Sequence, residues 1–169
     1  MKSFRWIVPI VGTLAATAAC GGDPYERYGN AVHADVDAGM ADAFQMSARL
    51  QLTVVHNRIP DDSLPVAARI VTRAAGAVRK RALHFAAVKP PPDFSEAHAG
   101  LSAAFSRVAD ALEAMGSAFQ RCAEAPCQAQ VDSVSSQFGF VGEDLKNGRA
   151  YVQRLLLRHG VMLRLAGAT

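Results

Sequence analysis

The sequence predicts an all-α protein, an up-down-up-down four-helix bundle that follows an N-terminal signal or anchor segment. Half of the 169 residues are hydrophobic, but only 7% are aromatic and alanine dominates, which favours closely packed helices over a sheet. Apolar residues recur at helical spacing in four segments. The connections between these segments are short, so consecutive helices are expected to pack antiparallel.

The distribution of charge supports the same arrangement. Residues 23–62, 63–92, 93–144 and 145–169 carry net charges of −4, +6, −6 and +5. In an up-down ring each helix then has oppositely charged neighbours, which favours the correct pairing over alternatives. The sign changes inside the last helix, at Leu145, so its first half does not share this complementarity.

The chain starts with the pattern of a secretory signal. Lys2 and Arg5 form a positive region, and an apolar region follows from Ile7 to Ala19. The uncharged run over 6–22 has 17 residues, at the lower limit for a helix that crosses a bilayer core. It contains Pro9 and ends in small residues, which suits a cleaved signal better than a permanent span.

The end of this region, Thr17-Ala18-Ala19-Cys20, resembles the lipobox of bacterial lipoproteins. In that family the signal is cut before the cysteine, whose thiol and new amino group are then acylated; Thr17 stands where the family usually has leucine. The resemblance covers the first 22 residues. It implies a signal peptide over 1–19, lipidation at Cys20, and a location at the bacterial cell envelope facing the periplasm or the exterior. Simple secretion and an uncleaved anchor are the alternatives. The polar composition of the next residues predicts a lipidated tether over 20–29, and the helical periodicity behind it predicts the bundle over 30–169.

Removal of the leader changes what the composition indicates. Without Lys2 and Arg5, about 150 residues remain, with 16 basic and 15 acidic side chains, so no global nucleic-acid footprint is left. Cys122 and Cys127 remain as a close pair, which in an exported protein favours a disulfide. Four intervening residues do not match the Cys-x-x-Cys spacing of redox sites.

The four helices are predicted over 30–58, 64–88, from about 93 to 121, and 128–163. Their inward residues, in chain order, are Val36, Met40, Ala43, Leu50 and Val54; Val71, Ala74, Val78 and Phe85; Leu101, Phe105, Val108, Leu112, Met115 and Phe119; Val131, Val134, Phe138, Val141, Leu145, Val152 and Leu155. The third helix has the clearest pattern, with alternating spacings of four and three. Gly139, Gly142 and Asn147-Gly148 predict a kink or break in the fourth.

Two surfaces are candidates for binding. A basic stripe on the second helix, Arg69, Arg73 and Lys80, suits anionic lipid headgroups or an acidic partner. Pairing with the acidic neighbouring helices is the simpler explanation, because the alternating charge pattern predicts it without a ligand. The chain end from Tyr151 to Leu165 carries more apolar residues than one buried face requires. Arg154, Leu157, Arg158, Val161 and Met162 could dock a membrane complex or a second copy; burial under the N-terminal tether is the alternative.

No catalytic signature is present in the sequence. It contains no Gly-x-Ser-x-Gly elbow, phosphate-binding glycine loop or His-Glu-x-x-His helix. A haem or metal carrier is the alternative function, with Met40 or Met46 and His159 as conceivable ligands, but surface or helix-end roles explain the five histidines better. The sequence therefore predicts no metal, no cofactor and no enzyme, but a lipid-anchored binding or accessory protein at a bacterial membrane, in a membrane-protein complex or a homo-oligomer.

Overall fold

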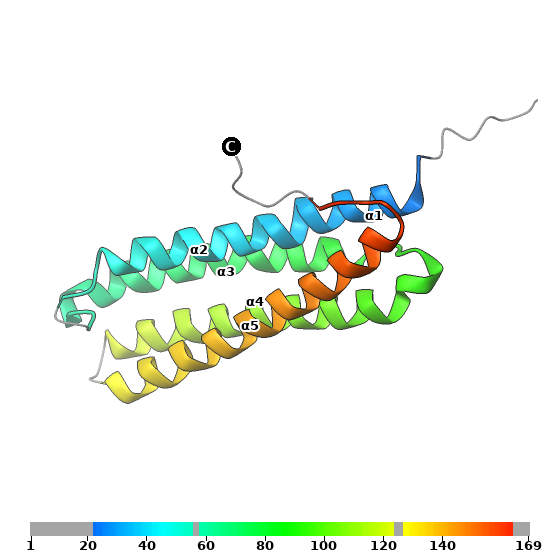
Figure 1. Ribbon diagram of the computed structural model, residues 1–169. Coiled ribbons are helices and arrows are strands. Elements are labelled where there is room, and N and C mark those ends of the chain that lie inside the picture. The colour runs from blue at the N-terminus through cyan, green and yellow to red at the C-terminus, as the bar shows by residue number, and fades with distance from the viewer. Residues whose placement is uncertain (1–21, 56–57, 124–126, 164–169) are drawn as a thin grey trace, which may run out of the picture.

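The computed structural model describes residues 22–55, 58–123 and 127–163, and they form the predicted four-helix bundle (Figure 1). The elements are α1 (Pro24–Ala31), the π-helix η1 (Val32–Asp37), α2 (Ala38–Gln51), the 3₁₀ turn η2 (Asp61–Ser63), α3 (Leu64–Ala86), the 3₁₀ turn η3 (Pro92–Phe94), α4 (Ser95–Cys122) and α5 (Gln128–Arg158). α1, η1 and α2 continue one another and together make the first long helix of the bundle.

The first helix begins earlier than the sequence pattern predicts. The Asp23 side chain accepts a hydrogen bond from the Tyr25 backbone N–H at 2.9 Å, and Pro24 occupies the first turn, where its missing N–H costs nothing. Tyr28 and Gly29 are buried. The tether predicted over 20–29 is therefore wrong from Pro24 onward, while Cys20 lies outside the described residues.

The first helix also ends earlier than predicted. α2 stops at Gln51, not at residue 58. Three β-branched residues follow, Thr53, Val54 and Val55, whose restricted side chains suit an extended chain. Val55 and Arg58 exchange backbone hydrogen bonds of 2.8 and 3.1 Å, which closes a tight bridge between them.

The core lies between the four long helices and is formed largely by the predicted stripes; Val54, predicted to face inward, is exposed because it follows the end of α2. All six predicted inward residues of α4 and all four of α3 are buried. Seven of the largest fully buried side chains are Tyr28, Phe85, Phe94, Phe105, Phe119, Leu101 and Leu112. Alanines such as Ala67, Ala75 and Ala109 are buried between them, so small residues bring the helix backbones close together.

α5 runs without interruption, so the break predicted at its glycines is absent. A glycine costs a helix only about 1 kcal/mol, and the buried Leu145, Val152 and Leu156 offset that cost. The helix ends at Arg158 rather than at Leu163. Gly160 adopts a φ of 74°, and the N–H groups of Gly160 and Val161 donate to the carbonyls of Leu157 (3.1 Å) and Leu156 (3.0 Å). This Schellman ending turns the chain back over α1.

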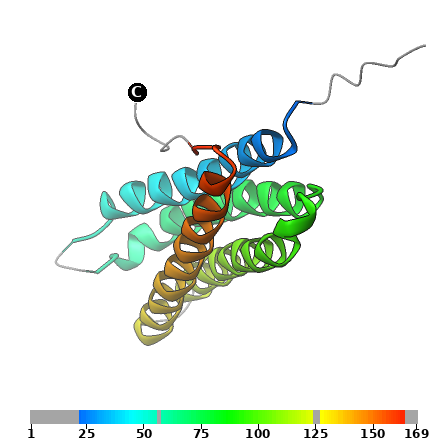
Figure 2. The same cartoon turned by 45° about the vertical axis from the view of Figure 1, so that its right-hand side comes forward.

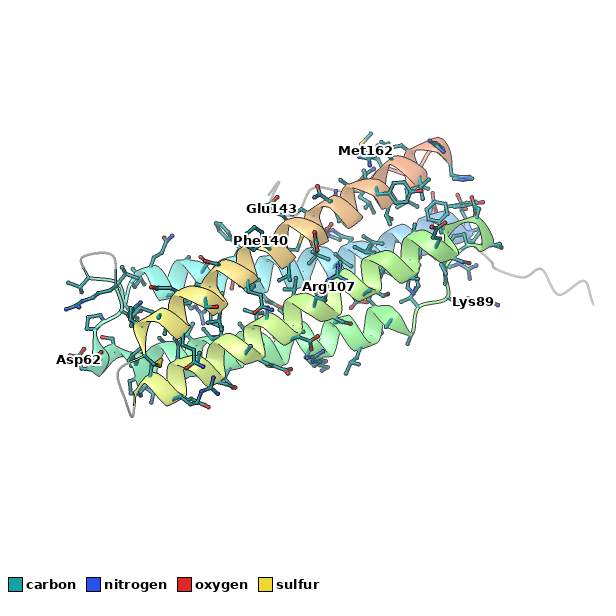
Figure 3. All side chains as sticks on the ribbon, turned by 90° about the horizontal axis from the view of Figure 1, so that it is seen from below. Asp62, Lys89, Arg107, Phe140, Glu143 and Met162 are labelled. Carbon is teal, nitrogen blue, oxygen red and sulfur yellow. A yellow bond between two sulfur atoms is a disulfide. The ribbon has the colours of Figure 1, made fainter. Side chains whose placement is uncertain are left out.

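The bundle has two distinct ends (Figures 1 and 3). The α1 end holds the start of α1, the α3–α4 connection with Lys89, and the last turn of α5 with Met162. The disulfide end holds the α2–α3 and α4–α5 connections, with Asp62 and the two cysteines. α4, with 28 residues, spans about 40 Å between them.

Neighbouring helices pair their charges as the sequence predicts. Arg79 of α3 pairs with Asp110 and Glu113 of α4, and Arg81 of α3 with Asp42 of α2. The pair between Arg107 of α4 and Asp144 of α5, at 3.4 Å, is not part of the predicted pattern, because Asp144 precedes the change of sign at Leu145. Within the described stretches, no helix combines the length and apolarity required to span a membrane.

Candidate functional site

At the α1 end of the bundle, an aromatic cluster joins the start of α1, the 3₁₀ turn η3 and the C-terminal end of α5. The rings of Tyr25 and His159 stack, with centroids 3.7 Å apart and planes at 11°. Phe94 packs against both rings, at 5.5 and 5.8 Å. Asp93 accepts a hydrogen bond from the Tyr25 hydroxyl and pairs with His159, each at 3.2 Å. The start of α1 and the end of α5 are therefore held to the same turn, η3.

A buried polar pair lies beneath this cluster. The Tyr28 hydroxyl and His98 Nδ1 are 3.2 Å apart, and both rings pack against Phe85. Burial raises the pKa of Tyr28. Burial also lowers the pKa of His98, although a hydrogen bond with the Ala86 backbone opposes this shift. The expectation of a surface role is wrong for His98, which is buried, although it does lie at a helix end, in the first turn of α4.

Two buried aspartates of η1 connect the first helix to α3 and α5. Asp37, 1% exposed, receives two hydrogen bonds from Arg149 of α5, at 2.9 and 3.1 Å, and lies 3.2 Å from His33. Asp35 binds His84 of α3 at 2.7 Å. Both aspartates are buried although they are only two residues apart, because one contacts α3 and the other contacts α5. The two aspartates are paired with His84 and Arg149, and these pairs hold the first helix against α3 and α5.

The predicted C-terminal patch is divided by the structure. Met162 is 77% exposed and Leu157 47%, and Arg154 and Arg158 are exposed as well. Val161 is half-buried and, like the buried Leu163, packs over Gly29 of α1. The alternative of burial under the N-terminal segment thus holds for Val161 and Leu163. Met162, Leu157 and the two arginines remain open to a partner.

The predicted basic stripe is exposed, and in the part of the chain that the structure describes it forms no ion pair between helices. Arg69, Arg73 and Lys80 all lie open on α3. Among the described residues, the ion pairs of α3 run through Arg79, Arg81 and His84 instead. Pairing with the acidic helices therefore explains other basic residues of α3. Arg69, Arg73 and Lys80 themselves are exposed to solvent.

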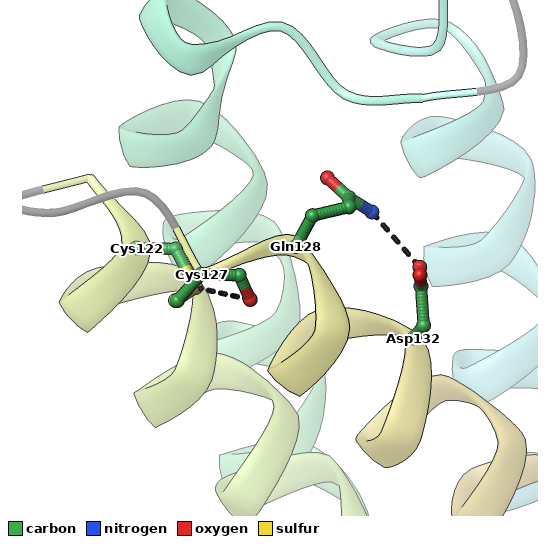
Figure 4. Close-up of a disulfide and its surroundings, with 4 residues drawn as sticks. All are labelled: Cys122, Cys127, Gln128 and Asp132. Carbon is green, nitrogen blue, oxygen red and sulfur yellow. Dashed lines mark hydrogen bonds between the residues drawn. A yellow bond between two sulfur atoms is a disulfide. The ribbon is translucent and has the colours of Figure 1, made fainter.

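The disulfide end is closed by a local link. Cys122, the last residue of α4, and Cys127, directly before α5, are joined by a disulfide with their Cα atoms 5.1 Å apart (Figure 4). Next to it, the Gln128 side chain donates to Asp132 at 2.9 Å in the first turn of α5. The disulfide fixes the turn between two helices that are already neighbours.

A groove opens between α2 and α5, which sequence reasoning missed. α5 runs obliquely to α2, so the two helices separate toward the disulfide end (Figure 2). The α2/α5 groove, of about 260 Å³, is lined by Met40, Ala43, Phe44, Ser47, Val108, Phe138, Gly139, Gly142, Glu143, Leu145 and Lys146. Phe44 is 76% exposed at its edge. Gly139 and Gly142 signal it in the sequence, because no side chain fills the space beside them.

The conceivable haem ligands are not brought together. Met46 is a core residue, and Met40 shares the α2/α5 groove with Leu145. His159 comes fourteen residues after Leu145 along α5, a rise of about 20 Å. Within residues 22–55, 58–123 and 127–163, no cluster of three or more His, Cys, Asp or Glu side chains could hold a metal ion.

Comparison with known proteins finds no family model, curated protein or solved structure that matches this chain.

Proposed function

We propose that this chain is a lipid-anchored extracytoplasmic helical bundle that acts as a binding or accessory subunit at a bacterial membrane. The observation that carries the proposal is the position of Cys20. It ends a signal-like leader, and four residues later the first helix of the folded domain begins at Pro24. A cysteine at this sequence position is suited to acylation, since it precedes the first helix by only a few residues.

The disulfide is a second, independent support for an extracytoplasmic location. Cys122 and Cys127 are linked, and structural disulfides persist mainly in oxidising compartments. With this pair joined, Cys20 is the one cysteine of the three that the disulfide does not use. Lipidation would account for it.

An accessory role is supported by the kind of surface that the bundle exposes. The polar groups in its interior are paired with one another, as with Asp37 and Arg149 or Asp35 and His84. By contrast, Phe44 and Met162 expose most of their apolar surface. Exposed apolar residues beside a groove or a chain end are typical of docking surfaces.

Substitution of the cysteine tests the anchor. In the producing bacterium, Cys20→Ser is expected to remove the protein from the carbonate-washed membrane fraction or to leave it with an uncleaved leader. The double variant Cys122→Ser/Cys127→Ser is the control and should stay membrane-bound. Intact mass of the purified wild type should correspond to a chain that starts at Cys20 and carries acyl groups. A soluble wild-type species that starts at Met1 would refute the proposal.

Matched aromatic substitutions test the accessory role. Phe44 lines the α2/α5 groove, whereas Phe140 has the same 76% exposure and does not line it. After crosslinking in intact cells and purification in detergent, Phe44→Asp or Met162→Asp should lose a partner or a second copy that Phe140→Asp retains. Identical crosslinking patterns for all three variants and the wild type would argue against docking at either surface.

A further inference from the structure

The proposed anchor determines which part of the bundle stays near the bilayer. From Cys20 to Pro24 the chain advances by four residues, and a fully extended chain spans at most about 3.5 Å per residue. The start of α1 can therefore lie no more than about 14 Å from an acylated Cys20. Since the acyl chains are inside the hydrocarbon core, this distance keeps α1 in or beside the headgroup layer.

The C-terminal segment is fixed to the same part of the bundle. His159 stacks on Tyr25, and Tyr25 is only five residues after Cys20 in the sequence. Val161 and Leu163 pack over Gly29, one turn further along α1. Met162 lies between them and, with Glu26 and His33, lines a hollow of about 500 Å³ beside α1. The first turns of α1 and Met162 consequently belong to one corner of the molecule (Figures 1 and 3), and the proposed anchor joins the chain four residues before it.

This corner exposes the residue types that suit a membrane interface. Met162 and Leu157 supply exposed apolar surface, and the Arg154 guanidinium lies 5.8 Å from the centre of the half-exposed Tyr151 ring. Arg158 is exposed in the last turn of α5. Neither arginine takes part in an ion pair among the described residues. Apolar side chains next to arginine and tyrosine bind at the level of lipid headgroups.

We propose that this corner, built from Leu157, Arg158 and Met162 with Tyr151 and Arg154 beside them, is a lipid-contact surface. The inference rests on the proposed acylation of Cys20 and adds a second point of contact to it. Met162 and Leu157 enter the interfacial layer, and the two arginines bind lipid phosphates. The bundle is thereby held with its disulfide end away from the bilayer.

A rival orientation is defined by the basic stripe. Arg69, Arg73 and Lys80 are exposed along α3, and a bundle lying on this face would bring them to the lipid. Arg69 is seventeen residues, or about 25 Å, from the end of α3 at Ala86. A bundle held by its α1 corner keeps Arg69 off the surface, so the two orientations make opposite predictions for α3.

The composition of the chain offers a direct test. Its one tryptophan, Trp6, lies in the leader, so a cleaved protein contains none. Three single-tryptophan variants report on three surfaces: Met162→Trp at the proposed contact, Val66→Trp on the face of the basic stripe, and Leu52→Trp at the disulfide end. All three native side chains are exposed, so the fold should tolerate each substitution, which circular dichroism checks. The acylated proteins are reconstituted into vesicles of phosphatidylcholine and phosphatidylglycerol with brominated acyl chains.

The expected result is strong bromine quenching and a blue-shifted emission for Met162→Trp, with neither effect for Val66→Trp or Leu52→Trp. Adding Arg154→Glu/Arg158→Glu to Met162→Trp should weaken the quenching, while adding Arg69→Glu/Arg73→Glu should not. Quenching of Val66→Trp would establish the rival orientation, and quenching of Leu52→Trp would mean that the bundle lies flat. Either result, or no quenching of Met162→Trp, overturns the inference.

Failure of the inference can be distinguished from failure of the anchor. Intact mass shows for each sample whether Cys20 carries acyl groups. Tryptophan emission from the parent protein would reveal a retained leader, because Trp6 is its only source. An acylated protein whose Met162→Trp variant is not quenched retains the proposed function and loses the contact surface. An unacylated protein refutes the anchor first.

Discussion

The two ends of the bundle are held together in different ways. At the α1 end, residues far apart in the sequence meet: Tyr25 stacks on His159, and Arg149 binds Asp37, 112 positions away. At the disulfide end, the closing contacts are local, the Cys122–Cys127 link and the backbone bridge between Val55 and Arg58. One end depends on the whole chain being folded, and the other on connections that form between neighbouring residues.

This difference explains where the seam between α2 and α5 is open. Toward the α1 end, the buried ion pair and the packing of Val161 and Leu163 on Gly29 bring the first and last helices into contact. Toward the disulfide end, both local links join consecutive helices, and neither draws α2 onto α5. The α2/α5 groove lies on that side, so an open surface for docking coexists with a closed, anchored end.

The largest effect is expected from breaking the ion pair that closes the seam. Arg149→Ala leaves Asp37 buried with only His33 beside it, and an uncompensated buried charge costs about 3–5 kcal/mol. Urea unfolding measures the loss. Asp37→Leu/Arg149→Met removes both charges and should recover most of the stability, because an apolar pair of similar volume replaces a buried ion pair well. Equal destabilisation by the single and double variants would contradict the role of the pair.

A smaller effect is expected at the opposite end. Cys122→Ser/Cys127→Ser should lower the free energy of unfolding by roughly 2 kcal/mol, the chain-entropy value for so short a loop. Because the link is local, hydrogen exchange should rise at the end of α4 and the start of α5 and stay unchanged in α1. Faster exchange in α1 of the double variant would show that the two ends are coupled.

Local patterns identify the middle of the chain well and its ends poorly. α3 begins at Leu64, α5 begins at Gln128 and α4 ends within one residue of its predicted end, because prolines and apolar periodicity mark these boundaries. α1 was predicted as a tether, although Asp23-Pro24 followed by Glu26 carries a helix-start pattern. The polar composition of this segment favours a tether instead. The burial of Gly29 depends on Val161 and Leu163, which lie about 130 positions further along the chain and which no local pattern can reveal.

The candidate surfaces show the same division. The disulfide pairing follows from the spacing of two cysteines, and the excess of apolar residues near the C-terminus correctly marks an unusual segment. Which of these residues are exposed depends on Gly160, whose positive φ folds Val161 and Leu163 onto α1 and leaves Met162 outside. The α2/α5 groove depends on the angle between α5 and α2, and the residue pattern of either helix alone does not predict that angle.

Glycine substitutions should distinguish the open and closed sides of α2. Gly142→Ala is expected to raise stability by about 0.5–1 kcal/mol, since nothing lies within 4 Å of the added Cβ and the backbone of α5 is stiffened. Gly39→Ala in α2 places its Cβ 2.7 Å from a ring carbon of Phe105 and should cost about 1–3 kcal/mol. Thermal unfolding of both variants is the measurement. A destabilising Gly142→Ala would mean that the groove is closed in solution.

The smallest effect is expected from pH and should appear at the α1 end. The buried charged or polar groups of the described core, Asp35, Asp37 and His98, all lie on that side of the molecule. Because burial lowers the pKa of His98, the unfolded chain binds a proton more readily than the folded one. The stability contributed by neutral His98 is therefore present above its unfolded pKa of about 6.5 and is lost as the pH falls through the lower folded value.

His98→Asn should consequently flatten the loss of stability between pH 7.5 and pH 5, when urea unfolding of the variant is compared with that of the wild type. At pH 8 the imidazole is neutral in both states, so the difference measured there gives the cost of the substitution itself. In the wild type, hydrogen exchange at pH 5 should rise first in α1 and the start of α4, where Tyr28 and His98 meet, and later in α5 next to the disulfide. If exchange rose equally along the bundle, its two ends would unfold as one unit. The difference between long-range contacts at the α1 end and local contacts at the disulfide end would then have no effect on local stability.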